Sequence, residues 1–373
     1  MACDYNLLPH PDIQTMTPYI PGKSIEELAK EQGISDIIKL ASNENPRGCS
    51  PRVIEAMHAL TIHQISSYPI AHAHPLVQKL AAKLSIDENW LTLSHGSDAL
   101  FQLLINCFAL HRDRHILTHD YAFQTYSILA KVLGVPLVST PLLSNWQVDI
   151  QALIQACNEK TALIFIANPN NPTGTFITHD DILHLLKHIP QTTLLVLDEA
   201  YHEFLNPANK PDSVSLLTAF SNVVITRTFS KAYGLAGLRL GYAISHPTIH
   251  ALLQKIVLPF TINIAALTAG LAALEDEAFI LQTAELNQEE LKNVRKQLTQ
   301  QGFNCLPSYG NFITFDCKVD GKIVFDALLK QGIIVRSLHP YGLNQYLRVT
   351  IGTPNQNRRF LDALSRITYT QNT

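Results

Sequence analysis

Short apolar runs alternate with helix-like segments along the middle of the chain. Residues 97–110 carry apolar side chains at helical spacing and predict a helix, and 115–118 predicts the strand that follows. A second predicted helix, 178–188, opens on a threonine with Asp181 three residues later, a capping pattern. The remaining β-rich runs, too apolar to alternate and so typical of strands covered on both faces, are 135–140, 162–167, 194–197 and 223–227.

Strands that alternate with helices predict an α/β fold with a mainly parallel sheet wrapped by helices. In such sheets, binding sites form at the carboxyl ends of the strands. We therefore expect functional side chains directly after the predicted strands, where the polar motifs of this chain also fall.

The pattern changes after residue 263, where a long helical stretch continues through 301. Short predicted strands follow at 312–316, 333–335 and 346–351, which indicates a smaller α+β domain. The first 45 residues contain a short helix and the strand-like I-I-K-L, and we expect them to pack with the C-terminal part. The predicted organisation is an N-terminal arm, a large domain and a small domain, at 1–45, 46–265 and 266–373.

Composition narrows the function classes. Charged residues make up 16% of the chain, below the usual quarter or so, so we expect much of it to be buried or in subunit contact. The net charge is -3 and no run of Lys and Arg forms a basic stripe, which argues against nucleic-acid binding. Small molecules and a second copy of the chain are the expected partners.

Cysteine spacing and hydropathy indicate a cytoplasmic protein. The 6 cysteines contain no C-x-x-C pair and no disulfide-type spacing, which predicts reduced thiols. The start of the chain lacks a basic segment followed by an apolar stretch, and no run of about 18 apolar residues suggests a membrane span.

The chain contains 16 histidines, which raises the question of a metal site. His184 and His188 stand four residues apart, as do His246 and His250, and that spacing aligns two side chains on one helical face. Neither pair encloses the glutamate of H-E-x-x-H or has a third ligand nearby. We therefore predict no metal site.

Lys231 is the first candidate for chemistry. It is the only lysine of the segment 226–242, which leaves a β-rich strand, has a serine just before the lysine and ends in a glycine-punctuated turn. Desolvation or a neighbouring cation lowers the pKa of a lysine, and the neutral amine can then condense with a carbonyl. Taken alone, a lysine after a strand is more often an ordinary surface residue.

Three further motifs follow predicted strands or precede a helix. Asp198 ends the run 194–197, and a carboxylate there could keep a pyridine nitrogen protonated, although such an acid is as often a helix cap. In N-P-N-N-P-T-G, two prolines restrict the backbone and can hold the Asn171 amide rigidly toward a ligand. Gly96 precedes a predicted helix whose free N–H groups can receive a phosphate.

The ordered set of motifs resembles the fold-type I pyridoxal-phosphate aminotransferases, and most closely the histidinol-phosphate aminotransferase family. The resemblance implies a mainly parallel seven-stranded sheet in the large domain, pyridoxal 5'-phosphate as cofactor and a homodimer. It covers nearly the whole chain and is carried by G-S-D, N-N-P-T-G, D-E-A-Y, S-K-A-Y-G-L-A-G-L-R-L-G, P-Y-I-P-G-K, L-A-S-N-E-N-P, S-S-Y-P and Y-L-R-V-T-I-G-T.

The resemblance also implies a role for each matching residue. Lys231 would hold the cofactor as a Schiff base and act as the acid and base of the proton shift, while Asp198 would pair with the ring nitrogen. Asn171 and Tyr201 would bind the phenolic oxygen. The cofactor phosphate would be bound by Arg239, Ser230 and the backbone amides of Ser97 and Asp98, with Tyr68 reaching it from the other subunit. Phe123 stands where the family stacks an aromatic ring on the cofactor, often a tyrosine.

For the substrate, the resemblance implies arginines that bind first a phosphate-bearing amine and then glutamate or 2-oxoglutarate. A guanidinium group binds such anions bidentately. The implied residues are Arg348 and Arg336, with Tyr19 and Asn43 closing the pocket. The implied reaction moves an amino group between L-histidinol phosphate and 2-oxoglutarate in histidine biosynthesis.

Other functions stay open at the level of sequence. An aromatic amino acid aminotransferase and a phosphothreonine-type decarboxylase share the lysine, aspartate and phosphate motifs on the same fold. A non-catalytic pyridoxal-phosphate regulator would carry an added helix-turn-helix segment, which we do not find. A dinucleotide-binding module is disfavoured because the glycine-rich segment follows Lys231 instead of forming G-x-G-x-x-G between a strand and a helix.

Overall fold

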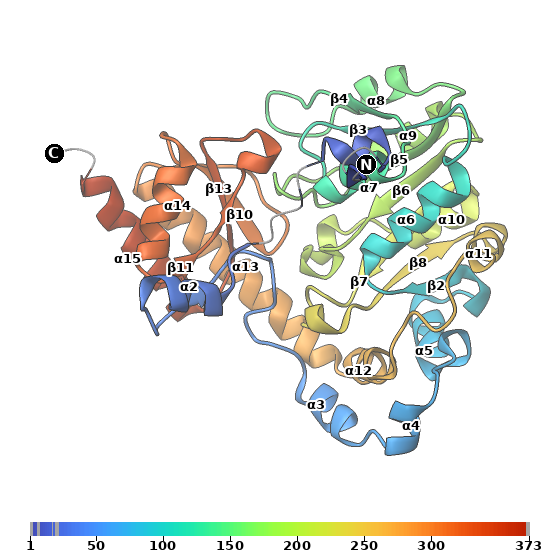
Figure 1. Ribbon diagram of the computed structural model, residues 1–373, viewed down its shortest axis with the longest axis horizontal. Coiled ribbons are helices and arrows are strands. Elements are labelled where there is room, and N and C mark those ends of the chain that lie inside the picture. The colour runs from blue at the N-terminus through green and yellow to red at the C-terminus, as the bar shows by residue number, and fades with distance from the viewer. Residues whose placement is uncertain (1–2, 6–7, 17, 19–21, 371–373) are drawn as a thin grey trace.

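The computed structural model describes residues 3–5, 8–16, 18 and 22–370 (Figure 1). Within these residues, the larger unit is built on a seven-stranded sheet with the order β2-β8-β7-β6-β5-β3-β4. Strand β8 is antiparallel to both of its neighbours, and the pairs from β7 through β4 are parallel. The strands are β2 (Leu91–Ser94), β3 (His115–His119), β4 (Leu137–Thr140), β5 (Thr161–Ala167), β6 (Leu194–Asp198), β7 (Val223–Thr228) and β8 (Gly241–Ser245).

The predicted α/β fold is confirmed, with two differences in the sheet. Strands β5, β6 and β7 are buried along their whole length, as their apolar runs predicted. The prediction that residues 135–140 form a doubly covered strand is wrong, because β4 lies at the sheet edge and Val138 and Ser139 are exposed. Strands β2 and β8 are absent from the prediction; β2 is short, and β8 begins directly after the glycine-rich turn.

Helices cover both faces of this sheet and extend below it in Figure 1. The predicted helices near 97–110 and 178–188 are confirmed as α6 and α9, and Thr178 and Asp181 form the expected capping box. Helices α1–α11 are Pro11–Gln14, Ile25–Gln32, Pro51–His58, Ile62–Ser66, Pro75–Leu84, Ser97–Phe108, Gln124–Val132, Ile150–Ala156, His179–His188, Ser213–Ala219 and Pro247–Gln254.

The smaller unit has its own sheet and its own apolar core. Its strand order is β12-β13-β10-β9, all antiparallel, with β9 (Asn304–Cys305), β10 (Phe312–Asp316), β12 (Arg336–Ser337) and β13 (Tyr346–Thr350). Its helices are α13 (Glu277–Gln300), α14 (Gly321–Lys330) and α15 (Pro354–Thr370). The N-terminal arm joins this unit, because β1 (Ile38–Lys39) pairs in parallel with β11 (Ile333–Ile334).

The predicted helical stretch 263–301 is two helices. Helix α12 (Ile264–Leu274) ends at Glu275, and α13 starts after Asp276, whose carboxylate accepts from the Phe279 amide as an N-cap. Helix α12 packs its apolar side chains into the core of the large sheet. The three-part division stays a prediction, and this packing favours a second boundary near 275 instead of 265.

A buried ion pair between Glu199, which follows β6, and Arg227 of β7 links the two strands near their carboxyl ends. The Arg227 guanidinium contacts Glu199 Oε2 through Nε at 2.9 Å and Nη2 at 2.8 Å, and both side chains are buried. Ser213 donates to the other carboxylate oxygen, and His202 Nδ1 lies 3.3 Å from Oε2. Removing one partner of such a pair leaves an uncompensated charge in the interior.

We therefore expect Arg227→Met to lower the free energy of unfolding by about 3–5 kcal/mol, measured by urea denaturation. Adding Glu199→Leu should recover much of that loss, because it removes the stranded charge. The matched control is Lys322→Met, which breaks the exposed pair with Asp326 and should change stability little. Equal effects of Arg227→Met and Lys322→Met would contradict this account.

Candidate active site

A cavity of about 110 Å³ lies at the carboxyl ends of β5, β6 and β7. Parallel neighbouring strands end at the same edge of the sheet, so residues far apart in sequence meet there. Nine of the predicted site residues line it: Ser97, Asp98, Phe123, Asn171, Asp198, Tyr201, Ser230, Lys231 and Arg239. The remaining lining residues are Ala167, Ala200 and Thr228.

A second cavity, of about 150 Å³, shares Phe123, Asn171 and Lys231 with the first. Three of the predicted substrate residues line it: Asn43 from the arm, and Arg336 and Arg348 from the small sheet. Its other lining residues are Gly22, Ala41, Ser42, Gln124, Thr125 and Tyr341. The two cavities therefore meet at the lysine.

Two predicted residues remain. Tyr19 falls outside the described residues. Tyr68 lines neither cavity: it is 79% exposed and stacks on Phe260 with ring centroids 4.6 Å apart.

Lys231 is held between the large unit and the N-terminal arm. Its Nζ donates to the Ser42 carbonyl at 3.0 Å and lies 5.9 Å from the centre of the Tyr201 ring. Burial, followed by the positive charge of Arg348, lowers the pKa of Lys231 to about 8. A much larger share of the amine is therefore neutral near pH 8 than in an ordinary lysine.

Asp198 ends the central strand β6 and is 3% exposed. Its Oδ2 accepts from the Tyr126 hydroxyl at 2.8 Å, and its Oδ1 accepts from Thr226 Oγ1 at 3.3 Å. Burial raises the pKa of Asp198 to about 7, against the lowering effect of these hydrogen bonds. A cation placed in the cavity would favour the carboxylate form.

Two side-chain pairs lie beside the two cavities: Asn43 with Tyr201, and Asn171 with Arg348. Asn43 Nδ2 donates to the Tyr201 hydroxyl at 2.8 Å, which leaves the hydroxyl hydrogen to donate to a ligand. Burial raises the pKa of Tyr201 to about 12. Arg348 donates to Asn171 Oδ1 and, at 2.6 Å, to the Ala41 carbonyl.

An anion cradle forms where α6 begins. Arg239 Nη1 lies 3.4 Å from Ser230 Oγ, and Arg239 Nη2 lies 3.5 Å from Asp98 Oδ2. A Cβ at Gly241 would lie 2.7 Å from the Ser97 amide nitrogen, so only glycine lets β8 start against this helix turn. Free helix N–H groups and a guanidinium on one wall suit a phosphate group.

The sequence interpretation missed Tyr126, Thr226 and the arm carbonyls of Ala41 and Ser42. Tyr126 had a possible signal, since it stands one helical turn after Phe123 on a segment expected to face the ring. The carbonyls had none, because any residue type supplies a backbone oxygen.

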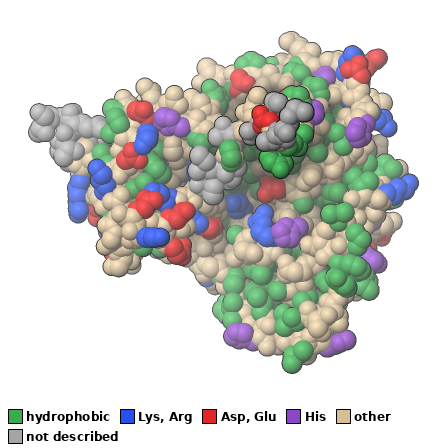
Figure 2. Space-filling model, viewed as in Figure 1, with side chains coloured by type: hydrophobic (Ala, Val, Ile, Leu, Met, Phe, Trp, Pro, Cys, Tyr) green, Lys and Arg blue, Asp and Glu red, His purple; other side chains and the backbone are tan. Residues whose placement is uncertain are grey.

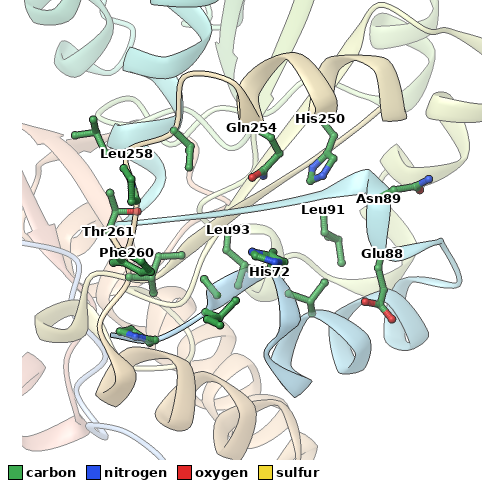
Figure 3. Close-up of a pocket in the computed structure, with 17 residues that line it drawn as sticks. His72, Glu88, Asn89, Leu91, Leu93, His250, Gln254, Leu258, Phe260 and Thr261 are labelled. Carbon is green, nitrogen blue, oxygen red and sulfur yellow. The ribbon is translucent and has the colours of Figure 1, made fainter. Parts of the chain in front are cut away.

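A larger cavity, of about 430 Å³, lies away from these side chains (Figure 3). It is lined by the segment after Tyr68, the start of β2 and the loop that carries Leu258 and Phe260. His72, Glu88 and His250 point toward it from separate elements, without a shared nucleophile or anion cradle. Its wall continues onto exposed apolar side chains, which is typical of a surface that another chain covers.

The described residues were also considered for metal binding and for membrane-spanning helices, and neither feature is present among them. In the part of the chain that the structure describes, no three His, Cys, Asp or Glu side chains are grouped so as to hold a metal ion. Among the same residues, no helix is long and apolar enough to cross a membrane.

Comparison with known proteins identifies consistent relatives. The family model for aminotransferase class I and II matches residues 35–364. Histidinol-phosphate aminotransferase 2 of Legionella pneumophila (strain Lens) is 52% identical over 98% of this chain and 99% of its own length. Histidinol-phosphate aminotransferase 2 of Haemophilus influenzae (strain 86-028NP) is 42% identical over 95% of this chain and 96% of its own.

Solved structures give the same picture. Histidinol-phosphate aminotransferase from Sinorhizobium meliloti, in complex with pyridoxal-5'-phosphate, superposes with a TM-score of 0.88 at 26% identity and covers 98% of each chain. L-threonine-O-3-phosphate decarboxylase from Porphyromonas gingivalis superposes with a TM-score of 0.78 over 89% of this chain and 100% of its own, at 22% identity, which shows a shared fold alone.

The lowered pKa of Lys231 is testable with an amine-acylating reagent. Only the neutral amine reacts, so in the cofactor-free protein labelling of the Lys231 peptide by trinitrobenzenesulfonate should rise with pH through a midpoint near 8 instead of 10.5. Mass spectrometry of the digested protein measures it, and Lys231→Met provides the blank. Arg348→Met should move the midpoint upward, because it removes a nearby positive charge. A midpoint near 10.5 in the unaltered protein would contradict the burial argument.

Proposed function

The chain belongs to the class I and II aminotransferase family, and we propose that it is a pyridoxal-phosphate-dependent histidinol-phosphate aminotransferase. It exchanges an amino group between L-histidinol phosphate and 2-oxoglutarate, giving imidazole acetol phosphate and glutamate in histidine biosynthesis. The observation that carries the proposal is the buried Lys231 amine, which borders both the Asp198 cavity and the arginine-lined cavity.

The first cavity fits the cofactor by its donors and its charge. Asp198 at one end suits a protonated ring nitrogen, and Arg239 with the first turn of α6 suits a phosphate. Tyr201 and Asn171 would bind the phenolic oxygen, and Phe123 would stack on the ring. Gly241 keeps the cradle open, because a Cβ would meet the Ser97 amide there.

When bound, pyridoxal phosphate supplies the electron sink for a carbon that loses a proton. Lys231 would hold it covalently through Nζ. With the substrate bound, the Lys231 Nζ would take the proton from the carbon that bears the amine and return it during amino transfer. A pKa of about 8 suits both directions of this proton movement near neutral pH.

The second cavity accounts for two different anionic substrates. Arg348 is buried and already oriented by Asn171 and the Ala41 carbonyl, so it meets an anion without losing much side-chain freedom. Arg336 lines the same cavity from β12, whose register pairs it with Arg348. We assign these guanidinium groups to the phosphate of histidinol phosphate and the carboxylates of 2-oxoglutarate.

We also propose a homodimer in which Tyr68 reaches the cofactor phosphate of the other subunit. Tyr68 lies outside its own cavity, in a surface where Ile62, Ile65, Ile70 and Leu258 are all more than half exposed. Figure 2 shows hydrophobic side chains gathered over this lower part of the molecule, where Figure 1 places α3 and α4. Such a surface is costly in water unless a partner covers it.

We assign the enzyme to the cytoplasm. The 6 cysteines are all free in the structure, as the thiols of a protein in a reducing compartment are.

Steady-state rates test the substrate. With 2-oxoglutarate as acceptor, we expect kcat/KM for histidinol phosphate to exceed that for phenylalanine by about ten- to a hundredfold, since a paired arginine contact is worth roughly 1.5–3 kcal/mol. Arg348→Met should remove most of that preference, and Lys231→Ala should abolish turnover. Faster turnover of phenylalanine would identify an aromatic aminotransferase, and carbon dioxide release from phosphothreonine would identify a decarboxylase.

Subunit complementation tests the role of Tyr68. A Tyr68→Ala subunit keeps Lys231, and a Lys231→Ala subunit keeps Tyr68, so their heterodimer contains one site with both residues. Co-expressed subunits should recover on the order of a quarter of the unaltered activity, because half of the random dimers are mixed. The control is each variant expressed alone. No gain over Tyr68→Ala alone, or a fully active monomer by size measurement, would contradict the arrangement.

A further inference from the structure

Tyr126 lies on α7 behind the cofactor cavity and contacts the residue on which the ring nitrogen depends. We propose that Tyr126 is a positioning residue, which fixes the Asp198 carboxylate by a hydrogen bond and keeps it ionised for the reaction. This proposal rests on the proposed function, because it assigns Asp198 to the cofactor ring.

The Tyr126 ring is held firmly in place. It is fully buried, stacked on Phe165 with centroids 4.8 Å apart and met edge-on by Phe101 at 5.0 Å. Phe123, which lines the cofactor cavity, touches it edge-on at 5.7 Å. Its hydroxyl donates to Asp198 Oδ2 at 2.8 Å.

The second carboxylate oxygen is held less tightly. Thr226 Oγ1 lies 3.3 Å from Oδ1, so the short bond to Tyr126 sets the plane of the carboxylate. Because β6 ends at Asp198 and its backbone is paired on both sides, the side chain has few other ways to be oriented. Tyr126 therefore links helix α7 to the end of the central strand β6.

The hydrogen bond from Tyr126 also affects the pKa of Asp198. Burial is the main cause that raises the pKa of Asp198, and Asp98 on α6 raises it further. The Tyr126 hydroxyl, Thr226 and the Ala200 backbone lower it, with Tyr126 first among them. The pKa of Tyr126 is well above 10, through burial and the Asp198 charge, so it stays a proton donor throughout the working range. Tyr201 also faces this carboxylate and is protonated there too.

Tyr126→Phe removes the hydroxyl and keeps the ring, and it is the direct test in the holoenzyme. A hydrogen bond to a charged group typically changes an equilibrium by at least about tenfold, so kcat should fall by roughly ten- to a hundredfold with KM changed less than about twofold. The acidic limb of the kcat profile should move to higher pH, because Asp198 then takes up a proton more readily. Thr226→Val should produce the same changes on a smaller scale.

Two readouts do not depend on turnover. The dissociation constant for pyridoxal phosphate, measured by fluorescence without substrate, should rise about tenfold in Tyr126→Phe. The infrared carboxylate band of Asp198, isolated by subtracting the spectrum of Asp198→Asn, should titrate at higher pH than in the unaltered protein. Both also report on Asp198 if histidinol phosphate proves to be the wrong substrate, which separates this proposal from the proposed function.

Phe101→Leu is the matched structural control. It disturbs the packing around Tyr126 and keeps the hydroxyl, so it should lower stability while the Asp198 band and the pH profile stay in place. The proposal is overturned if Tyr126→Phe leaves the Asp198 titration and the cofactor affinity unchanged. It is also overturned if Phe101→Leu shifts both as much as Tyr126→Phe does.

Discussion

Each buried carboxylate at the carboxyl edge of the parallel sheet requires a hydrogen-bond or ion-pair partner, and the architecture of the site follows from this constraint. Asp198 ends the central strand in a place that water does not reach, and an unpaired carboxylate there would be expensive. Tyr126 and Thr226 supply hydrogen bonds from α7 and β7, and in the proposed function the cofactor ring nitrogen would supply the opposite charge. The neighbouring Glu199 meets the same need differently, with a permanent partner in Arg227. Asp198 therefore remains available to a ligand, whereas Glu199 is paired within the protein and stabilises the fold.

The N-terminal arm joins the two units at the lysine. The peptide at 41–43 accepts from Arg348 through the Ala41 carbonyl, accepts from Lys231 through the Ser42 carbonyl and donates to Tyr201 through Asn43. The same Asn43 receives contacts from Thr350 and Asn311 of the small unit, so its position is set by both cores. Displacement of this segment would alter the cofactor pocket and the arginine pocket together.

Much of the site could be predicted because its residues follow buried strands. Asp198, Asn171 and Lys231 each stand just after an apolar run, and parallel pairing brings those strand ends together. The exposure of β4 could not be read from its sequence, since strand order depends on distant pairing. Residue type does not reveal which backbone carbonyls face a site, and the sequence interpretation assigned no role to Tyr126. The sequence did not predict which groups contact the site residues, because tertiary packing determines those contacts.

The shared wall of the two cavities explains how substrate and cofactor chemistry can be coupled. Asn171 accepts from Arg348 on the substrate side and lines the cofactor cavity on the other. An anion bound by Arg348 would meet a guanidinium group whose two terminal nitrogens already donate to Asn171 Oδ1 and to the Ala41 carbonyl. The negative charge of that anion would also offset the positive charge of Arg348, which helps to lower the pKa of Lys231. Anion binding would therefore raise the basicity of the Lys231 amine, which suits the proton uptake that we propose for it.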